Sequence, residues 1–435
     1  MGRNRPHIHT FGCRLNIWES EVMREQAEQA GLGNVNIVNS CAVTSEAEKQ
    51  SRQMVRRLKK EHPDTPVIVT GCAVQIAPER WADMPEADFI LGNHDKLQQQ
   101  SWDRLAADRL APALITDITQ IEQTASHMVD AFDNHTRAFV QIQQGCDHRC
   151  TFCIIPFGRG ASRSVPIDDV IRQVRNLLAG GVKEIVLTGV DITSWGADLE
   201  GRPRLGQLVL GLLDNIPELP RLRLSSIDPA EPDHYLMQAL SSHARLMPHL
   251  HLSVQHGDDL ILKRMKRRHL RRDVLRFCDE VRRRRPDTVL GADMICGFPT
   301  ETQDAHQASL NLIDEAGITY LHVFGYSPRE GTPAALMPQL KKSVIKSRVA
   351  EMRQHGADRL TAHLASRQHS VDMMLVESDN KGHLSSFEMA ELETGRYDAG
   401  ALVAVEIETA TDDRLVVRPL IEHSQTDAPA RPLAG

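Results

Sequence analysis

Three closely spaced cysteines carry the clearest chemistry in this sequence. Cys146, Cys150 and Cys153 form a C-x3-C-x2-C cluster that directly follows an apolar, alternating segment. Three thiolates in one short loop can bind three irons of a cubane [4Fe–4S] cluster, and the fourth iron is then left without a protein ligand. Such an iron can bind and activate a small molecule, whereas a site closed by four thiolates cannot do so without losing a ligand.

Other interpretations of this cluster remain open. Structural zinc usually has four protein ligands, and His148 lies inside the loop without a partner His at zinc-finger spacing. A disulfide is disfavoured because residues 1–9 are polar and basic and do not resemble a secretory signal, so we expect reduced thiols and a cytoplasmic location. The flanking residues Gly145, Phe152 and 158–160 (GRG) favour the iron–sulfur interpretation.

The length and charge of the chain restrict its class. A chain of 435 residues is too long for one ordinary core, so two or three domains are expected. The net charge is −7, but residues 370–435 hold 13 acidic and 5 basic residues, which leaves the rest of the chain close to neutral. No apolar run approaches the ~20 residues needed to span a bilayer, so no membrane partner is expected.

A second set of cysteines lies in the N-terminal part, residues 1–96. Strand-like runs at 7–11, 35–39 and 67–70 alternate with amphipathic stretches at 19–30 and 45–61, which predicts a small parallel α/β domain. Cys13, Cys41 and Cys72 each follow one of these strands. Ligands collect beyond the carboxyl ends of the strands in such sheets, so we expect the three thiols to converge. Three buried structural cysteines are the alternative.

The remaining chain predicts two further domains after a connector at 97–135. Six strand–helix units within 136–367 predict a partial parallel (β/α)6 barrel, with strands at 139–142, 184–188, 221–225, 250–254, 289–295 and 320–324. Short alternating strands within 368–422 predict a small antiparallel β-barrel of OB-like type. Residues 423–435 are predicted to be disordered. The fold class is therefore α/β with a C-terminal β-barrel.

Small and polar residues recur at the carboxyl ends of the central strands. The small molecule inferred for the open iron is S-adenosylmethionine (SAM), which needs close backbone approach and polar partners for its ribose, ammonium and carboxylate groups. Turns after strands are normally rich in such residues, so each one alone is weak evidence. The candidate SAM contacts are Phe152, Gly189, Asp191, Ser226, Gln255 and Gly297.

Basic runs suggest a polyanionic partner. The candidate contacts to RNA are Arg264, Lys266, Arg267, Arg268 and Arg271, in a stretch without acidic residues. Further runs lie at 282–285 and 52–60, and a solvated surface is the alternative for each run. A base that is to be modified must be unpaired or flipped out, which favours an RNA loop. Cys278 and Cys296 are interpreted as structural, with Cys296 a minor candidate for oxidation.

The motifs together resemble the radical-SAM methylthiotransferase family over nearly the whole chain. The similarity includes GCRLNIWESE around Cys13, NSCAVT around Cys41, TGCAVQ around Cys72, GCDHRCTFCIIPFGRGASRS around the central cysteines, and GFPTET and YSPREGTPAA further on. The C-terminal barrel resembles a TRAM module, but it is acidic, so the basic runs of the central section are expected to hold the tRNA instead. GCRLNIWESE and HVFGYSPREGTPA are most similar to the branch that modifies N6-threonylcarbamoyladenosine (t6A) at position 37 of tRNA.

The resemblance implies a transferase with two [4Fe–4S] clusters and SAM as cofactors. The cluster on Cys146, Cys150 and Cys153 would cleave SAM to a radical that removes hydrogen from adenine C2. The cluster on Cys13, Cys41 and Cys72 would carry the sulfur, which a second SAM methylates. No catalytic residue beyond the cluster ligands is expected.

The implied partners are tRNA through adenosine 37 of its anticodon loop, an electron donor such as flavodoxin or ferredoxin, and a sulfur donor. Three alternatives remain. The first two are methylthiolation of isopentenyladenosine 37 of tRNA and of an aspartate in a ribosomal protein. The third is a non-catalytic, metal-stabilised RNA-binding protein.

Overall fold

The computed structural model describes residues 5–107, 113–121, 136–230 and 233–420, and it divides into two compact units, 1–356 and 357–435. The boundary between the units falls inside the long helix α13 (Lys342–Ser366). The domain boundaries at 96, 135 and 367 stay predictions. The tail at 423–435 and the connector residues 108–112 and 122–135 lie outside the described residues.

The N-terminal part of the first unit contains a five-stranded parallel sheet in the order β1-β2-β3-β4-β5. The three predicted strands are confirmed as β1 (His7–Thr10), β2 (Asn36–Ser40) and β3 (Val67–Gly71). The sheet also contains β4 (Phe89–Leu91) and β5 (Ala113–Leu114), which the sequence did not reveal because both are very short.

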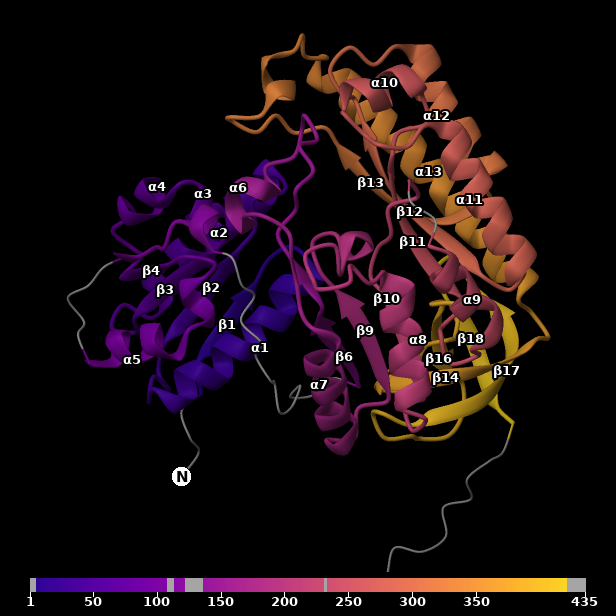
Figure 1. Cartoon of the computed structure of the whole chain (residues 1–435), viewed down its shortest axis with the longest axis horizontal. Coiled ribbons are helices and arrows are strands. Elements are labelled where there is room, and N and C mark those ends of the chain that lie inside the picture. The colour runs from indigo at the N-terminus through magenta and orange to yellow at the C-terminus, as the bar shows by residue number, and fades with distance from the viewer. Residues whose placement is uncertain (1–4, 108–112, 122–135, 231–232, 421–435) are drawn as a thin grey trace, which may run out of the picture. The chain divides into compact units, whose positions relative to one another are not determined.

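Helices cover both faces of this sheet (Figure 1). One face packs against α1 (Arg14–Gln29) and α5 (Gln99–Ala107), and the other against α2 (Ser45–Glu61), α3 (Cys72–Ile76) and α4 (Pro78–Ala82). Successive residues of β2 therefore enter different cores: Ile37 packs on the side of α1, and Val38 on the side of α2. A strand buried on both faces tends to be apolar at consecutive positions, as Val67–Ile68–Val69 of β3 and Ile37–Val38 of β2 are.

The central part of the first unit is the predicted partial barrel. Two three-stranded parallel sheets, β10-β9-β6 and β11-β12-β13, are linked by the parallel bridges Leu222–Leu246 and Ile227–Leu252. The six strands are β6 (Arg137–Gln141), β9 (Glu184–Thr188), β10 (Arg221–Leu224), β11 (His249–Gln255), β12 (Val289–Cys296) and β13 (Ile318–Gly325).

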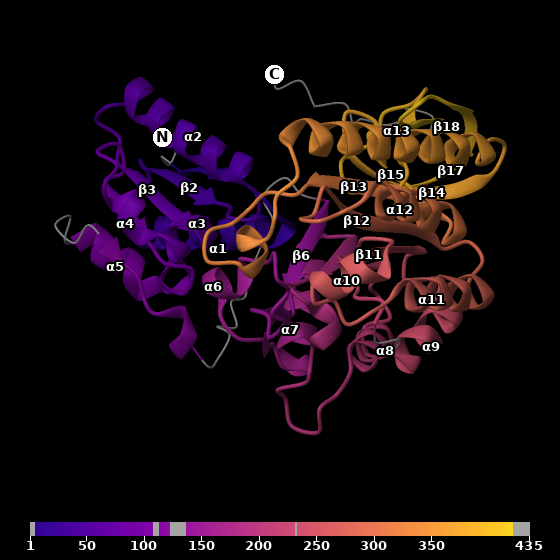
Figure 2. The same cartoon turned by 90° about the horizontal axis from the view of Figure 1, so that it is seen from above.

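Helices lie on the outer side of these strands (Figure 2). They are α7 (Ile167–Ala179), α8 (Leu205–Asn215), α9 (His234–Ser242), α10 (Asp259–Arg264), α11 (Arg271–Arg284) and α12 (Gln303–Glu315). Between β6 and α7 the chain forms the short hairpin β7 (Gln143–Gln144) and β8 (Arg163–Ser164), with α6 (Ile155–Arg159) between its strands. The central cysteines lie inside this hairpin.

The second unit contains the predicted small β-barrel. Its closed strand order is β14-β15-β16-β18-β17, with β14 (Val371–Ser378), β15 (Lys381–His383), β16 (Met389–Leu392), β17 (Leu402–Ala410) and β18 (Leu415–Pro419). Four of its pairs are antiparallel, but β16 and β18 pair in parallel, so the barrel is not wholly antiparallel. Met374, Val405 and Val417 form its core together with Leu364 of α13.

Candidate active site

The three N-terminal cysteines lie at one edge of the five-stranded sheet, as the sequence predicts. Cys13 occupies the N-cap of α1, Cys41 follows β2, and Cys72 begins α3. A Cβ atom on Gly12 would lie only 2.6 Å from Sγ of Cys41, so a glycine at this position lets the Cys13 loop approach Cys41. The three thiols are close enough to influence one another: Cys72 and Cys13 both raise the pKa of Cys41.

The protonation state of these thiols determines whether they can bind a metal. Burial, together with the neighbouring thiols, raises the pKa of Cys41 to about 12, so without a metal it is protonated at neutral pH. Binding to iron or zinc requires the thiolate and therefore releases protons. Cys13 is exposed, Cys41 and Cys72 are buried, and the three converge at one sheet edge, which fits a metal centre better than three inert core residues.

A buried network of charged side chains supports this fit. Arg159, 2% exposed, donates from Nε to Sγ of Cys72 at 3.2 Å, and from Nη1 and Nη2 to the carboxylate of Glu19 at 2.5 and 3.1 Å. Lys96 donates to the same carboxylate at 2.7 Å. Burial alone would raise the pKa of Glu19, but Arg159 and Lys96 lower it to about 2. Two cations and one carboxylate leave one positive charge beside Cys72, which suits an anionic sulfur ligand.

The central cysteines lie in a loop that folds back on α6. The amide of Cys146 donates to the carbonyl of Gly160 at 3.1 Å, and the amide of Cys153 donates to that of Cys150 at 3.0 Å. Gly145 has φ +74, and a Cβ there would lie 1.8 Å from the carbonyl oxygen of Ala161. The glycine is therefore required both by its backbone conformation and by the close approach of the two segments.

A second guanidinium approaches this loop. Arg267 donates to Sγ of Cys150 at 3.5 Å and to Oδ2 of Asp228 at 2.9 Å. Burial alone would raise the pKa of Asp228, but His269 and Arg267 lower it well below its usual value. Burial also raises the pKa of Cys146 to about 12 and that of Cys153 to about 11, so this loop, too, would lose protons on binding a metal.

His148 lies beside Cys146 rather than in a zinc-finger pair. Its Nε2 is 2.9 Å from Oδ2 of Asp191, and ligand atoms of His148, Asp191 and Cys146 all lie within 4.8 Å of one another. The loop thus places one imidazole and one carboxylate next to the thiols. This arrangement also brings Asp191, a predicted SAM contact, to the central cysteines.

The other predicted SAM contacts separate into two groups. Gly189 and Ser226 line a cavity described below, at the ends of β9 and β10. Phe152 instead packs edge-on against Phe298, which follows Gly297, with ring centroids 6.5 Å apart. Gln255 and Gly297 both have positive φ, at +71 and +78, where β11 and β12 end. The structure brings these two to neighbouring strand ends but not into that cavity.

The predicted RNA contacts also differ in their surroundings. Arg267 points inward, as described above, and Arg271 donates to the carbonyls of Gly257 and Ala308 and pairs with Glu315 at 2.7 Å. Arg264 donates to Oγ1 of Thr300 at 2.6 Å. Lys266 and Arg268 are the exposed members of the set. Carbonyls of Arg264 and Met265 accept hydrogen bonds from Thr151, so this basic segment lies against the central cysteine loop.

One cavity of about 440 Å³ joins the N-terminal cysteines to the barrel. Cys13 and Cys41 line it from the N-terminal sheet, and Thr188, Gly189 and Ser226 line it from the ends of β9 and β10. Three further lining residues come from adjacent strands: His251, Asp293 and His322. Oδ1 of Asp293 lies 2.9 Å from Nε2 of His251 and 3.2 Å from Nδ1 of His322, so the carboxylate joins both rings.

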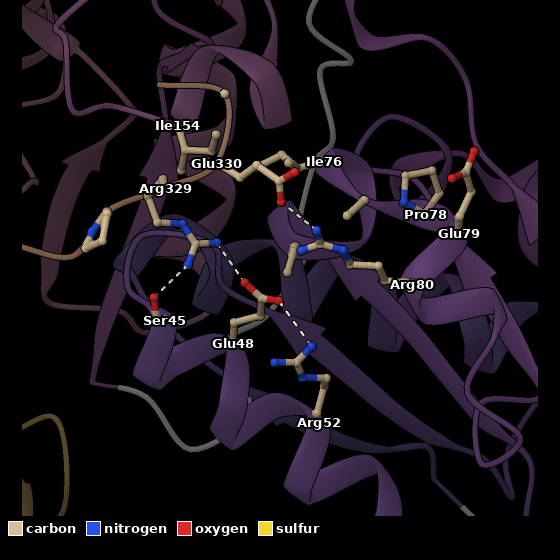
Figure 3. A pocket seen from close by; sticks show the side chains of 14 residues that line it. Ser45, Glu48, Arg52, Ile76, Pro78, Glu79, Arg80, Ile154, Arg329 and Glu330 are labelled. Atoms are coloured by element: carbon tan, nitrogen blue, oxygen red, sulfur yellow. Dashed lines mark hydrogen bonds and ion pairs between the residues drawn. The ribbon is translucent and has the colours of Figure 1, made fainter. Parts of the chain in front are cut away.

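A second cavity, of about 640 Å³, lies where the loop at 328–331 meets α2 and α4 (Figure 3). Arg329 pairs with Glu48 at 2.7 Å and is 11% exposed, whereas the pair of Arg80 and Glu330 at 2.6 Å is open to solvent. Ala73 and Ile154 also line this cavity, and each follows a cysteine of a different triad. The loop at 328–331 thereby fastens the barrel part of the unit to its N-terminal part.

Several of these residues were missed by the sequence analysis. Glu19 lies on an amphipathic helix and Lys96 near a domain boundary, where charged residues are normally solvated. Arg159 stands in the GRG stretch that was noted only as a flank. A charged residue at an apolar position of the helical pattern was the available signal for Glu19. His251, Asp293 and His322 alternate with apolar residues in their strands, and that period-2 pattern could have indicated an inward-facing polar row.

Two family models match the chain. The radical SAM superfamily matches residues 140–313, which contain the central cysteines and most of the barrel. A family described as uncharacterized protein family UPF0004 matches residues 5–92, which contain Cys13, Cys41 and Cys72.

Curated relatives are similar over most of the chain. The threonylcarbamoyladenosine tRNA methylthiotransferase MtaB of Rickettsia prowazekii is 46% identical over 406 residues, covering 92% of this chain and 96% of the relative. The protein of the same name from Bacillus subtilis is 33% identical, covering 79% and 78%. The tRNA-2-methylthio-N(6)-dimethylallyladenosine synthase of Paracoccus denitrificans is 33% identical, covering 79% and 80%.

A solved structure supports the fold. The radical S-adenosylmethionine methyltransferase TsrM from Kitasatospora setae, with cobalamin and a [4Fe-4S] cluster bound, aligns with a TM-score of 0.57 over 77% of this chain and 74% of that chain. The aligned residues are 14% identical, so the likeness concerns the fold alone.

Proposed function

The chain belongs to the radical-SAM methylthiotransferase family, and from this premise we propose that it inserts a methylthio group at C2 of t6A at position 37 of tRNA. It is an enzyme that uses SAM and two [4Fe–4S] clusters. The relative from Rickettsia prowazekii, named for the t6A substrate, is 46% identical, whereas relatives named for dimethylallyladenosine reach 31% to 35%.

The observation that carries the proposal is the cavity between the N-terminal cysteines Cys13 and Cys41 and the strand ends of the barrel. A cavity of about 440 Å³ lies within the range of sites that enclose a small molecule. Cys13 and Cys41 reach it from one side, and the strand ends Gly189 and Ser226 reach it from the other. A base held there would face the N-terminal triad while lying at the carboxyl ends of the barrel strands, where the active sites of such barrels are built.

The polar groups of this cavity favour t6A over isopentenyladenosine. A threonylcarbamoyl group carries a carboxylate, a hydroxyl and amides, each of which needs a hydrogen-bonding partner when buried. Imidazoles of His251 and His322 and the hydroxyl of Ser226 line the cavity and can supply such partners. Asp293 pairs with one nitrogen of each ring, and an isopentenyl group has no polar atom for the other nitrogen or for the hydroxyl.

The residues take separate roles in this proposal. Cys146, Cys150 and Cys153 bind the cluster whose open iron binds SAM, and Cys13, Cys41 and Cys72 bind the auxiliary cluster. When bound, the clusters and SAM supply the radical and the sulfur, and the protein orients the base and excludes water. Phe152, Gly189, Asp191, Ser226, Gln255 and Gly297 contact SAM.

The partners follow from the same proposal. The exposed side chains of Lys266 and Arg268 present positive charge to the anticodon loop of tRNA. Their segment is held against the cluster loop by Arg264, Arg267 and Arg271. An electron donor such as flavodoxin or ferredoxin and a separate sulfur donor complete the reaction. No helix in the described part of the chain could span a membrane. We propose that the protein acts in the cytoplasm, where its tRNA substrate resides.

Anaerobic reconstitution tests the enzyme, and nucleoside analysis tests the substrate. The proposal requires about eight irons per chain and reductive cleavage of SAM. One or two zincs without SAM cleavage would instead indicate the metal-stabilised RNA-binding protein. In a strain that lacks this protein and has no related enzyme, 2-methylthio-t6A should disappear from tRNA. Its persistence there, with loss of the methylthiolated isopentenyladenosine instead, would assign the chain to the other tRNA branch.

A further inference from the structure

We propose that Arg159 is a positioning residue for the auxiliary cluster: it holds the sulfur of Cys72 by a direct hydrogen bond and raises the reduction potential of the cluster. The proposal rests on the assignment of a cluster to Cys13, Cys41 and Cys72. It extends that assignment to a residue from another segment, because Arg159 ends α6, directly after the loop of the SAM-binding triad.

All three nitrogens of the Arg159 guanidinium donate hydrogen bonds. Nε donates to Sγ of Cys72 at 3.2 Å, while Nη1 and Nη2 form a two-pronged contact with the carboxylate of Glu19. Nη1 also donates to Gln144 at 3.0 Å, and Nη2 to Asn16 at 2.6 Å. A planar fork with donors on three nitrogens fits this arrangement, and a lysine ammonium cannot reproduce it. The orientation of the Nε donor toward Cys72 is thus fixed from the far side.

The partners of Arg159 reach the other N-terminal cysteines. Asn16, which accepts from Arg159, also lies 3.9 Å from Sγ of Cys13 and donates to the carbonyl of Ser40, the residue before Cys41. Asn93 donates to Sγ of Cys72 at 3.6 Å. Two side-chain donors, Arg159 and Asn93, therefore reach the sulfur of Cys72. Donors to cluster sulfurs are among the interactions that tune potential and orient ligands.

The charges around the triad predict the direction in which Arg159 shifts the reduction potential of the auxiliary cluster. Glu19, Lys96 and Arg159 are each at most 2% exposed. With both basic groups protonated and the carboxylate ionised, they carry one net positive charge. Reduction of a [4Fe–4S] cluster from the 2+ to the 1+ state adds one electron, taken here from dithionite, and so adds one negative charge. A nearby buried positive charge stabilises the reduced state more than the oxidised state, because water does not screen it. Loss of that positive charge must make reduction harder.

The test measures the midpoint potential of the auxiliary cluster by anaerobic EPR titration with dithionite. The full chain carries Cys146→Ala, Cys150→Ala and Cys153→Ala, so that the auxiliary cluster alone gives the signal. Four changes are compared in this background: Arg159→Gln, Arg159→Lys, Glu19→Gln and Arg163→Gln. Arg163 is the matched control, since it is 4% exposed and donates to the carbonyls of Arg159, Ala161 and Ile121 rather than to a sulfur.

The expected shifts differ in sign. Arg159→Gln lowers the potential most, Arg159→Lys lowers it less because the charge remains, and Glu19→Gln raises it. Arg163→Gln removes a buried charge but no donor to sulfur, so it lowers the potential less than Arg159→Gln does. If Arg159→Gln loses iron while Arg163→Gln keeps it, the result supports the role of Arg159 in holding the sulfur of Cys72. The direction of the potential shift is then decided by Arg159→Lys and Glu19→Gln. Unchanged potentials, or shifts of one sign in Arg159→Gln and Glu19→Gln, overturn this inference alone. A parent chain that binds no iron overturns the second cluster as well.

Discussion

Arg159 donates a hydrogen bond to the sulfur of Cys72 across 87 residues of sequence. The donor belongs to the hairpin that carries the central cysteines, and the acceptor belongs to the N-terminal sheet. Arg159 therefore links the hairpin of the central triad to Cys72, with a carboxylate and an ammonium packed behind it. A protein that must place one base between two reactive centres gains from such a rigid link, because small displacements of reacting groups are costly.

Replacing Cys72 by Ala separates the roles of the two triads. The variant should keep SAM cleavage, since Cys146, Cys150 and Cys153 are unchanged, but it should form no methylthio product. Iron should fall from about eight to about four per chain. The measurements are iron content, 5′-deoxyadenosine release and nucleoside mass spectrometry of the tRNA. Loss of SAM cleavage itself would contradict this division of labour.

Replacing Gly145 by Ala should remove the other cluster. The new Cβ would lie 1.8 Å from the backbone oxygen of Ala161, which cannot move aside as a flexible side chain could. We expect about four irons per chain and no SAM cleavage. Gly181→Ala is the matched control, because Gly181 also has positive φ, at +92, but its Cβ would meet no atom within 4 Å. It should cost about 1 kcal/mol of stability, the cost of a non-glycine residue at positive φ, and keep both clusters. Equal iron loss in both variants would refute the steric explanation.

The barrel interior should be sensitive to acid through Glu184. Burial alone would raise the pKa of this carboxyl, but Arg223 and Arg221 lower it to about 2. A folded-state pKa below the unfolded value of about 4.5 means that the stabilisation is complete above pH 5 and is lost as the pH falls toward 2. About 1 kcal/mol should be lost between pH 6 and pH 4. Denaturant unfolding at both pH values measures it, and Glu184→Gln should abolish that part of the difference. An identical pH dependence in the variant would exclude Glu184 as the cause.

The loop at 328–331 offers a contrast between a buried and an exposed ion pair. Arg329→Ala removes a partner of Glu48 where both side chains are about one-tenth exposed, and it should lower the free energy of unfolding by about 2 kcal/mol. Arg80→Ala removes the solvent-exposed pair with Glu330 and should leave the free energy of unfolding almost unchanged. Protease cleavage within the loop should rise in the first variant alone. Equal effects of the two changes would show that burial does not govern this contact.

Much of the architecture could be predicted from the sequence, because its signals are local. The helix over Ser45–Glu61 begins after Thr44, whose side chain accepts from the amide of Ala47, and its apolar positions keep helical spacing. The strand β9 has the apolar centre Ile185–Val186–Leu187, and β10 alternates arginine with leucine, and turns bound both strands. The cysteine motifs could be assigned to two triads because strand ends of a parallel sheet lie at one edge.

What could not be predicted depends on long-range partners. Lys96 and Glu19 are separated by 77 residues, and neither position differs locally from a solvated one. Arg267 looked like an RNA contact because its neighbours are basic, but its direction is decided by Asp228, which is 39 residues away. The parallel pairing of β16 with β18 likewise follows from closure of the barrel and not from either strand alone.

The most direct test of the central claim is a reaction of the reconstituted protein with defined tRNA. Anaerobic protein, SAM and dithionite are incubated with tRNA that carries t6A37, and separately with the same tRNA that carries unmodified A37 or isopentenyladenosine 37. Mass spectrometry of the digested tRNA should show a methylthio group in place of one hydrogen on t6A, with little change on the other two. SAM cleavage with unmodified t6A, or preferential methylthiolation of isopentenyladenosine, would contradict the account.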